Sequence, residues 1–384
     1  MKRSGIILGL WLGGVTMAAA QSEPMISFGE ESLLERLTDG QRKVDWADMN
    51  IQFCSAVDAS FQNGELDEAA FKVQRIRLEV LGGFYEKFTY HFRQSLNQYT
   101  TPNIPLDNLS GSVELAMVGW QLNDKWKLTA GKQPVQFSGY ECWVNAIKVR
   151  HYSDFNNTIP CYQAGLNVAY KMNDSHEFNF QLTNNRNGDS NDQFMYGLPE
   201  GVEPTKIPLL ATVNWDGYFV NHAMQLRYSL SYGQLAKNKN VFYFTCGNVW
   251  DKKPFLGYID FMYSREGIDS KGLISGVTVQ DGAGQTLSDV DYFTTIFNLD
   301  YRVASHWNVY VKGVYEQGNV FKSSGNISAG TYRRVWNAQL CAEYYPLKNS
   351  ELLCYLHLLY KNVHLTERAR RWGAESYNHQ RISL

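Results

Sequence analysis

After its first twenty residues the sequence has no long apolar run. A helix that crosses a membrane needs about twenty consecutive apolar residues, and no later segment approaches that length. The GxSxG, HExxH, P-loop and dinucleotide-binding glycine patterns are also missing. The formal net charge is only −2, so no excess of one sign favours a nucleic-acid partner. The absences argue against a helical membrane protein and leave no marked catalytic nucleophile.

Closely spaced cysteines and histidines are missing as well. The eight histidines are scattered, so we predict no metal site and no cofactor. Cys341 and Cys354 flank one expected turn, but residue alternation places them on opposite faces, which a disulfide cannot bridge without a bulge. We therefore predict mostly free thiols. The six cysteines include no CxxC pair: Cys54, Cys142, Cys161, Cys246, Cys341 and Cys354.

The N-terminus has the layout of a secretory signal peptide. A basic start at Lys2 and Arg3 is followed by an apolar stretch over residues 6–15 and by three alanines before Gln21. We predict that residues 1–20 are removed on export; a buried N-terminal helix is the weaker alternative. Export also places the mature chain in a compartment where disulfides can form.

Aromatic residues are abundant, at 14% of the chain, yet they are spread thinly along it. Apolar and polar residues alternate with period two, as in residues 71–80 and 221–232. In residues 71–80, one face carries Ile76 and Leu78 and the other Arg75 and Arg77. Lipid outside and water inside a β-barrel explain such alternation. The predicted fold class is therefore all-β, a transmembrane antiparallel up-and-down barrel.

Connections between the predicted strands alternate between short and long. The long ones are expected at residues 59–70, 97–111, 134–159, 184–206, 264–289, 318–331 and 362–374. Tight turns are expected at Gly82-Gly83, Asn123-Asp124, Asn173-Asp174, Trp215-Asp216-Gly217, Ala304-Ser305 and residues 346–349, with a weaker signal at 247–253. Bacterial barrels have short periplasmic turns and long external loops, so both chain ends are predicted in the periplasm. The count gives about sixteen strands, enough to leave an aqueous channel.

The chain accordingly divides into three parts. Residues 1–20 form the signal peptide, 21–47 a polar periplasmic extension with a short helical pattern, and 48–384 the barrel. The chain stops at Leu384, a few residues into the expected closing strand. Either the sequence is cut short or the last strand begins near Ala374.

The third external loop, residues 134–159, contains many potential anchors and is predicted to fold into the barrel as a constriction. Its candidate residues are aromatic or charged: Tyr140, Glu141, Lys148, Arg150 and Asp154.

Alternation directs charged side chains of both signs toward the interior of the barrel. One reading is a basic stripe that guides anions past facing acids; the other is a set of salt bridges that hold the wall. The inward basic residues are Arg75, Arg77, His91, Arg93, Lys127, Lys171, Arg227, Arg302 and Lys312. The inward acids are Asp58, Glu79, Glu114, Glu177, Asp260, Asp300, Glu316 and Glu343.

The predicted function is passive diffusion of small hydrophilic solutes or ions through the outer membrane of a Gram-negative bacterium. The partners are then membrane lipid and the solutes themselves. A barrel plugged by its loops, with a structural or ligand-binding role, is the main alternative. Some outer-membrane barrels are lipases or proteases, but no nucleophile is marked in this sequence.

Several stretches of the sequence resemble the phosphate-selective porin O and P family. The stretches are Val73-Gln74-Arg75-Ile76-Arg77-Leu78, residues 84–92 and Leu128-Thr129-Ala130-Gly131-Lys132-Gln133. Residues 139–155 resemble the branch found in Bacteroidota. The resemblance extends from about Asp48 to the C-terminus.

This resemblance implies a sixteen-stranded barrel, usually trimeric, whose third loop folds into the channel. It places Arg75 and Arg77 on the family's basic strand and Lys132 just before the constriction loop, as a further channel-lining base. The best-known members pass phosphate or pyrophosphate along an arginine ladder to a lysine cluster. Residues 134–159 contain only Lys148 and Arg150 where that cluster would lie, so the resemblance implies a general or differently selective porin.

Overall fold

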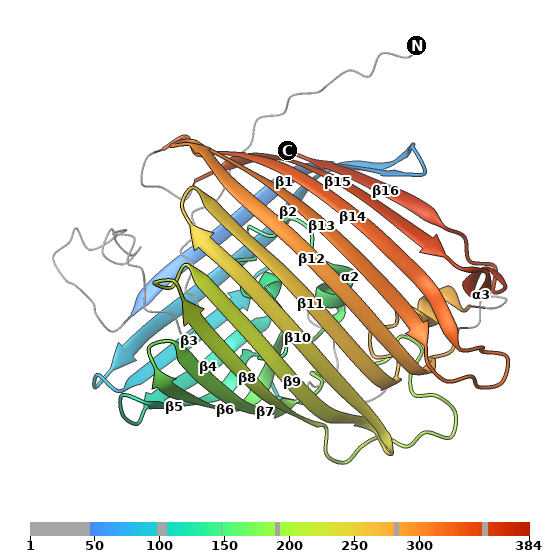
Figure 1. Cartoon of the computed structure of the whole chain (residues 1–384), viewed down its shortest axis with the longest axis horizontal. Helices are drawn as coiled ribbons and strands as arrows, with labels where there is room; N and C mark the ends of the chain where they lie inside the picture. The colour runs from blue at the N-terminus through green and yellow to red at the C-terminus, as the bar shows by residue number, and fades with distance from the viewer. Residues whose placement is uncertain (1–46, 98–105, 147, 189–192, 280–283, 348–351) are drawn as a thin grey trace, which may run out of the picture.

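The computed structural model describes residues 47–97, 106–146, 148–188, 193–279, 284–347 and 352–384 (Figure 1). The predicted signal peptide and nearly all of the predicted extension lie outside the described residues. The strands of the first half are β1 (Asp48–Gln62), β2 (Glu65–Phe84), β3 (Phe88–Ser95), β4 (Val113–Gln121), β5 (Trp126–Pro134), β6 (Tyr162–Asn173), β7 (His176–Asn184) and β8 (Leu209–Phe219). Those of the second half are β9 (Met224–Ala236), β10 (Lys239–Lys252), β11 (Phe255–Ile268), β12 (Ser288–Ala304), β13 (Trp307–Val320), β14 (Gly330–Tyr344), β15 (Cys354–Leu365) and β16 (Tyr377–Ser383).

These strands form one closed antiparallel barrel. Each strand pairs with its neighbours in sequence, and β16 pairs with β1, for example Asp58 with Ser383. Because the barrel is closed, the backbone groups along every strand edge have a neighbouring strand to hydrogen-bond with, as strands that span a lipid bilayer require. The predicted all-β barrel of about sixteen strands is confirmed. The closing strand begins at Tyr377, close to the second alternative considered from the sequence.

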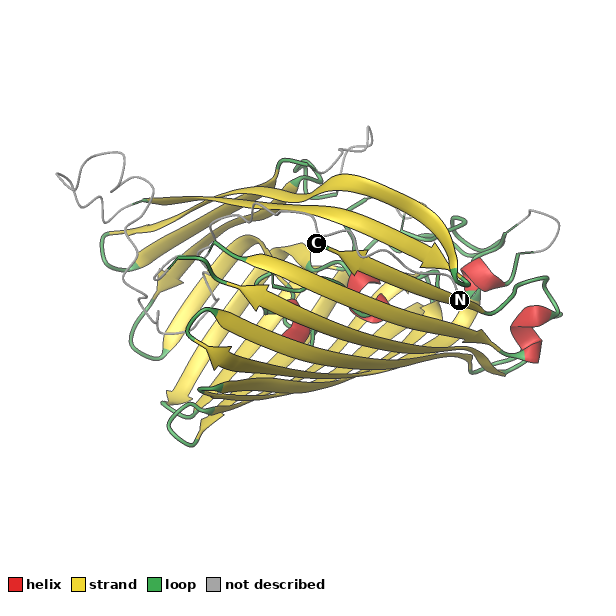
Figure 2. Ribbon diagram, turned by 90° about the horizontal axis from the view of Figure 1, so that it is seen from above, coloured by secondary structure: helices red, strands yellow, loops and turns green. Residues whose placement is uncertain are grey.

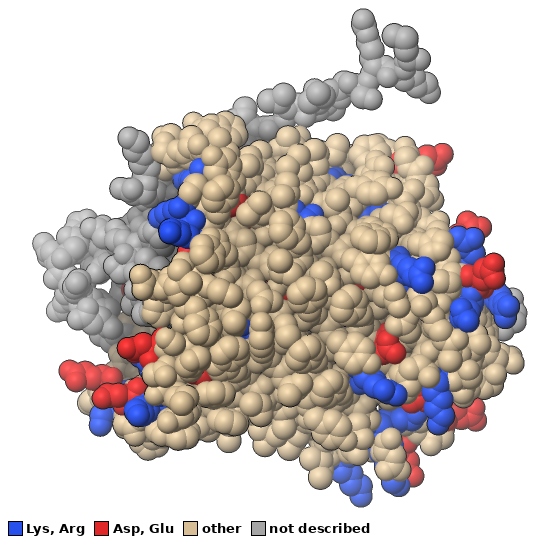
Figure 3. Space-filling model, in the orientation of Figure 1, with Lys and Arg blue, Asp and Glu red and all other residues tan. Residues whose placement is uncertain are grey.

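The outer and inner faces of the wall differ as alternation predicts. Along β14, Arg334, Trp336 and Leu340 are exposed, whereas Asn337 and Gln339 are buried. The visible outer face has few charged atoms across its middle, and Lys, Arg, Asp and Glu gather toward its ends (Figure 3). This uncharged surface is the one that contacts lipid.

Aromatic side chains flank the short turns at one end of the barrel. Phe84 stacks on Phe88, and Phe88 stacks on Trp120. Ring pairs also lie at the following turns: Trp126 with Tyr170, Phe255 with Tyr301, and Trp307 with Tyr344. Such rings at one rim are typical of the aromatic girdle at a membrane interface.

The first long connection predicted from the sequence is wrong. Residues 59–70 continue β1 and β2, which join through a two-residue turn at Asn63 and Gly64, with φ of 51° and 89°. Both residues are in the left-handed region that a tight hairpin turn of this twist requires. A second short connection on the same side, between Ala236 and Lys239, was not predicted.

Three tight turns were placed wrongly because a glycine was read as a turn signal. Gly82-Gly83 lies within β2, and the chain turns at Tyr85 and Glu86, with φ of 53° and 57°. Trp215-Asp216-Gly217 lies within β8, where a Cβ on Gly217 would meet the rings of Trp215 and Phe219 at 2.6 and 2.9 Å. Gly247 lies within β10, and that hairpin turns at 253–254.

Four short helices accompany the strands in the described part of the chain. They are η1 (Tyr140–Cys142), α2 (Asp154–Thr158), η2 (Ser275–Val277) and α3 (Glu367–Arg370). Helices lie both inside the ring of strands and at its rim (Figure 2). No helix among the described residues is both long and apolar enough to cross a membrane.

Part of the barrel interior is a packed apolar core. It joins Phe137 and Phe155, from the connection between β5 and β6, to Tyr243 of β10 and Ile296 of β12. Ile274, from the connection between β11 and β12, packs in the same cluster. Side chains therefore fill the interior beside β10–β14. Any open space inside the barrel lies against another part of the wall.

Candidate functional site

The connection between β5 and β6, residues 135–161, is called the inner loop here; residue 147 lies outside its described part. Two wall carboxylates hold it by its backbone. Asp260 of β11 accepts hydrogen bonds from the amides of Tyr140 and Glu141 at 2.9 and 2.8 Å. Glu316 of β13 accepts from the amides of Asp154 and Phe155 at 3.0 and 2.9 Å. Each carboxylate thus satisfies two neighbouring amides at the start of a short helix.

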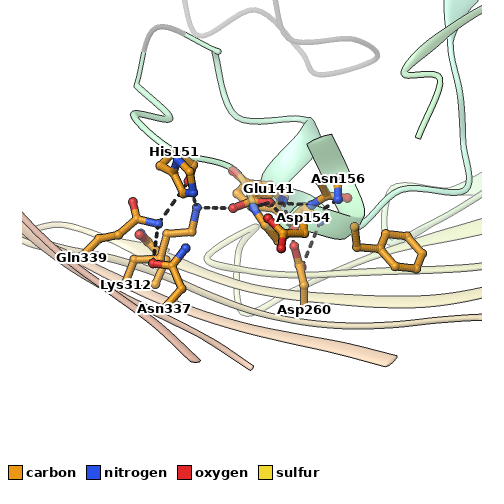
Figure 4. A network of polar contacts seen from close by, with 12 residues as sticks. Glu141, His151, Asp154, Asn156, Asp260, Lys312, Asn337 and Gln339 are labelled. Carbon is orange, nitrogen blue, oxygen red and sulfur yellow. Dashed lines mark hydrogen bonds and ion pairs between the residues drawn. The ribbon is translucent and has the colours of Figure 1, made fainter. Parts of the chain in front are cut away.

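Glu141 lies at the centre of the polar contacts that hold the inner loop (Figure 4). Its carboxylate accepts hydrogen bonds from the Ser153 hydroxyl at 3.0 Å and the Asn156 amide at 2.6 Å. It also forms an ion pair with Lys312 of β13. Lys312 in turn donates to the carbonyl of His151 at 2.8 Å. Fully buried charges are tolerated only with such partners, so Glu141 and Lys312 both serve to position the loop.

Asp154 ties the loop to the far strands of the barrel. It pairs with Arg333 of β14 and Lys361 of β15. Burial opposes ionisation of Asp154, but these two cations outweigh it and lower its pKa to about 2. Nearby, burial together with the charges of Lys361 and Lys312 lowers the pKa of His151 to about 3, so this imidazole is neutral near neutral pH.

Arg150 also contacts β14 and β15. Its guanidinium pairs with Glu343 at 3.2 Å and lies 3.6 Å from the centre of the Tyr355 ring. Lys148 is exposed, and the ring of Tyr140 lies 5.4 Å from that of Tyr258. The five loop residues singled out from the sequence therefore divide: four contact the wall and Lys148 faces solvent.

An open cavity of about 450 Å³ lies between the inner loop and the wall formed by β1, β2 and β16. Its charged lining is mainly basic. The lining residues are Cys54, Asp58, Ser60, Lys72, Val73, Gln74, Arg75, Ala146, Val149, Arg150, His379 and Arg381.

Sequence alternation missed several residues of this cavity because β2 contains a bulge. Cys54 pairs with Arg75 but Ser55 pairs with Val73, so Gln74 is an extra residue. Such a bulge changes which side chains of a strand point inward. Lys72 and Gln74 consequently line the cavity with Arg75, although strict alternation would have pointed them toward lipid.

His379 and Arg381 were missed for a different reason. The sequence does not fix where the closing strand begins, so alternation alone does not assign the inward face of β16. The pairing of Arg381 with Leu359, and of Ser60 with Arg381, sets that register.

Most of the basic residues predicted on the wall are neutralised by acids. Arg77 and Arg93 both pair with Glu114, at 2.8 Å each, and the guanidinium of Arg93 also donates to the Tyr162 hydroxyl at 2.6 Å. Lys132 pairs with Asp107 at 2.9 Å. These contacts correspond to the reading in which inward charges hold the wall.

Of two further predicted bases, Arg227 is also paired with an acid and Arg302 lies at the end of a strand. Arg227 pairs with Asp216 at 2.9 Å and stacks over Trp143 of the inner loop, 3.6 Å from its ring centre. Arg302 is exposed at the turn end of β12, where it donates to the carbonyl of Ser305 at 2.6 Å. Neither lines the cavity.

Arg75 and Lys127 are different. Neither makes an ion pair within the described part of the chain, and both are half-buried. The Nη1 atom of Arg75 is buried and has no hydrogen-bond partner among the described residues. A guanidinium with an unused donor beside a cavity is suited to meet an anion.

Comparisons with known proteins agree with the barrel. Residues 47–375 match the family model described as phosphate-selective porin O and P, whereas no curated protein matches the sequence. Three similar solved structures have low sequence identity. The outer membrane channel DcaP of Acinetobacter baumannii has a TM-score of 0.56 and 13% identity, covering 89% of this chain and 99% of that one.

The anion-selective porin from Comamonas acidovorans also has a TM-score of 0.56, with 8% identity over 88% of this chain and 98% of the other. The trimer form of OmpT, an outer membrane protein of Vibrio cholerae, has a TM-score of 0.50 and 10% identity over 88% and 98%. Identities this low show a common fold and nothing finer.

Proposed function

The chain belongs to the phosphate-selective porin O and P family and is thus a channel of the Gram-negative outer membrane, and we propose that small inorganic anions diffuse through it along the basic cavity. The observation that carries this proposal is the charge of the cavity lining. Lys72, Arg75, Arg150 and Arg381 line it against a single acid, Asp58.

The pairing of these groups supports an anion path. Arg381 is matched by Asp58 at 2.8 Å, Arg150 by Glu343 at 3.2 Å and Lys72 by Glu68 on the same strand, whereas Arg75 has no matching acid among the described residues. Fixed positive charge in a narrow space with low-dielectric walls raises the local concentration of anions. The Comamonas porin of similar fold is described as anion-selective, which agrees with the direction of the proposal.

Preference for phosphate over other anions is not part of this proposal. Within the described part of the inner loop, Lys148 is the one lysine, and it is exposed. Strong selection of a multivalent anion needs several donors converging on it. We therefore expect phosphate, added at millimolar concentration, to leave the chloride current of the channel unblocked.

Reversal potentials in a planar bilayer under a salt gradient test the anion path. The wild-type protein should prefer chloride over potassium, and Arg75→Gln should reduce that preference. Arg302→Gln is the matched control, because it removes one arginine from the turn end rather than from the cavity. A cation preference in the wild type, or equal effects of the two substitutions, contradicts the proposal.

A barrel plugged by its loops remains the second candidate, and the apolar packing beside β10–β14 favours it. Single-channel recording separates the two directly, since a plugged barrel conducts no ions. Catalysis is not proposed, and ester and peptide hydrolysis by the detergent-solubilised protein should stay at the level of an empty-vector preparation.

We also propose that the protein is a homotrimer. The OmpT structure of similar fold is described as a trimer form. Chemical cross-linking of outer membranes followed by denaturing electrophoresis should then give a ladder that ends at three copies. A ladder that ends at one copy contradicts the proposal.

A further inference from the structure

Two cysteines lie in the inner loop. Cys142 is the last residue of η1, and Cys161 directly precedes β6. Cys161 lies at the base of the loop, where its carbonyl accepts a hydrogen bond of 3.1 Å from the amide of Val135. The segment between the two cysteines contains Arg150, which lines the cavity, and α2. A covalent link between them would close this segment into a ring.

The fold brings both cysteines to one place. The carboxylate of Glu141, next to Cys142, accepts a hydrogen bond of 2.6 Å from the Asn156 side chain. The carbonyl of Asn156 in turn accepts a weak hydrogen bond of 3.9 Å from the Cys161 thiol. The neighbouring Cys161 raises the pKa of the Cys142 thiol, and Cys142 lowers the pKa of the Cys161 thiol. Both side chains also pack against the same apolar core. Both are present as free thiols in this structure.

The cysteine pair suggested by sequence proximity has a less favourable position. Cys341 pairs across the sheet with His357, and Cys354 pairs with Tyr344. The two cysteines are therefore displaced by three residues along the paired strands, and Cys341 is fully buried on the inner face. Facing side chains of adjacent strands, not side chains displaced along them, come within disulfide distance.

We propose that Cys142 and Cys161 form a disulfide in the exported protein and that this bond holds the inner loop closed. An outer-membrane protein passes through an oxidising compartment, where such bonds form and persist. The inference does not depend on which ions the channel prefers. It assigns to the loop a covalent restraint in addition to the ion pairs of Glu141 and Asp154.

The oxidant is a protein disulfide of the thiol–disulfide oxidase class. A thiolate of one cysteine attacks the oxidant's disulfide and forms a mixed disulfide, and the second cysteine then attacks that bond. The Cys142–Cys161 bond forms and the oxidant's own disulfide breaks. The two thiol protons and two electrons of the protein end on the oxidant as two thiols.

Peptide mapping of protein isolated from outer membranes tests the bond without any measurement of ion flow. The sample is denatured and alkylated with iodoacetamide before any reduction, and then digested with trypsin. Cleavage after Lys132, Lys148, Arg150 and Lys171 separates peptide 133–148, with Cys142, from peptide 151–171, with Cys161.

The expected result is a linked pair of these peptides, lighter by two hydrogens than their sum and split by reduction. Cys54 should carry the alkyl group in the same sample and serves as the internal control. Alkyl groups on both Cys142 and Cys161 without prior reduction would overturn the proposal.

A second measurement uses the folded protein. A reducing agent should lower the unfolding midpoint of the wild type but leave that of Cys142→Ser unchanged, because the loop is already open in the variant. Cys246→Ser, on the outer face of β10, should behave as the wild type does. An unfolding midpoint of the wild type that does not respond to reduction would also overturn the proposal.

Discussion

Lys312 on β13 and Glu141 in the inner loop form an ion pair in which both side chains are almost fully buried, with 3% and 0% of their surface exposed. The pair joins the loop to the wall at its centre. Removing one member of a buried pair leaves the other charge without compensation, which typically costs about 3–5 kcal/mol.

We therefore predict that Lys312→Met lowers the free energy of unfolding by about 3 kcal/mol. Urea denaturation of the folded protein in detergent measures it. Lys171→Met is the matched control, because the Lys171–Asp174 pair is 50% and 89% exposed, and exposed ion pairs contribute little to stability. Similar losses for both variants would show that the buried pair does not hold the loop.

Gly247 makes room for the inner loop. A Cβ at this position would lie 3.1 Å from the Tyr140 amide nitrogen and 3.1 Å from an oxygen of Asp260. We predict that Gly247→Val pushes Tyr140 away from Asp260 and makes the loop accessible to protease in the folded barrel. Gly313→Val is the control, since nothing lies within 4 Å of the added Cβ there. Limited proteolysis followed by mass spectrometry compares the two variants, and intact inner loops in both contradict the prediction.

Cys54 is a native probe of the cavity. It lines the cavity, and its thiol lies 3.9 Å from the guanidinium of Arg150. Because the lining is mainly basic, an anionic methanethiosulfonate should react with Cys54 several times faster than a cationic one of similar size. The rates are measured by mass spectrometry, with Cys54→Ser as the control that should lose the label. Equal rates would mean that no net positive potential exists at this site.

His151 makes the loop sensitive to acid. Its pKa is lowered from 6.5 to about 3 in the folded protein, so the folded state binds fewer protons than the unfolded state between these values. The contribution of neutral His151 to the stability of the fold is complete above about pH 6.5 and is lost progressively as the pH falls toward 3. At pH 4.5 we expect a loss of roughly 2–3 kcal/mol, measured as a lower unfolding temperature.

The variant His151→Gln should remove most of this dependence, while the wild type and the variant converge near pH 7.5. Asp154 acts at lower pH. Its pKa is lowered from 3.8 to about 2, so its ion pairs with Arg333 and Lys361 stabilise the fold above about pH 4 and are lost between pH 4 and 2. An equally steep pH dependence in His151→Gln would contradict the role given to this residue.

Several local features could be predicted from the sequence because each depends on neighbouring residues only. Alternation along residues 71–80 identified Arg75 and Arg77 as inward and Ile76 as outward without any knowledge of the partner strand. The turns at Asn123 and Asn173 were correct because these side chains hydrogen-bond the backbone two residues ahead, as Asn123 does with Lys125 at 3.0 Å. Gly247 misled the prediction because a side chain there would meet Tyr140 and Asp260, which are distant in the chain, whereas the space beside Gly217 is taken by the rings of Trp215 and Phe219.

The sequence by itself determined the barrel, because period-two alternation and turn residues act locally and lipid outside with water inside leaves few other arrangements. Only the tertiary structure decided which charges remain available to a solute. Arg77 is neutralised by Glu114 and Lys132 by Asp107, whereas Arg75 faces a cavity. Those pairings depend on strand register, on a bulge in β2 and on the path of the inner loop, and Coulomb interactions act through space rather than along the chain.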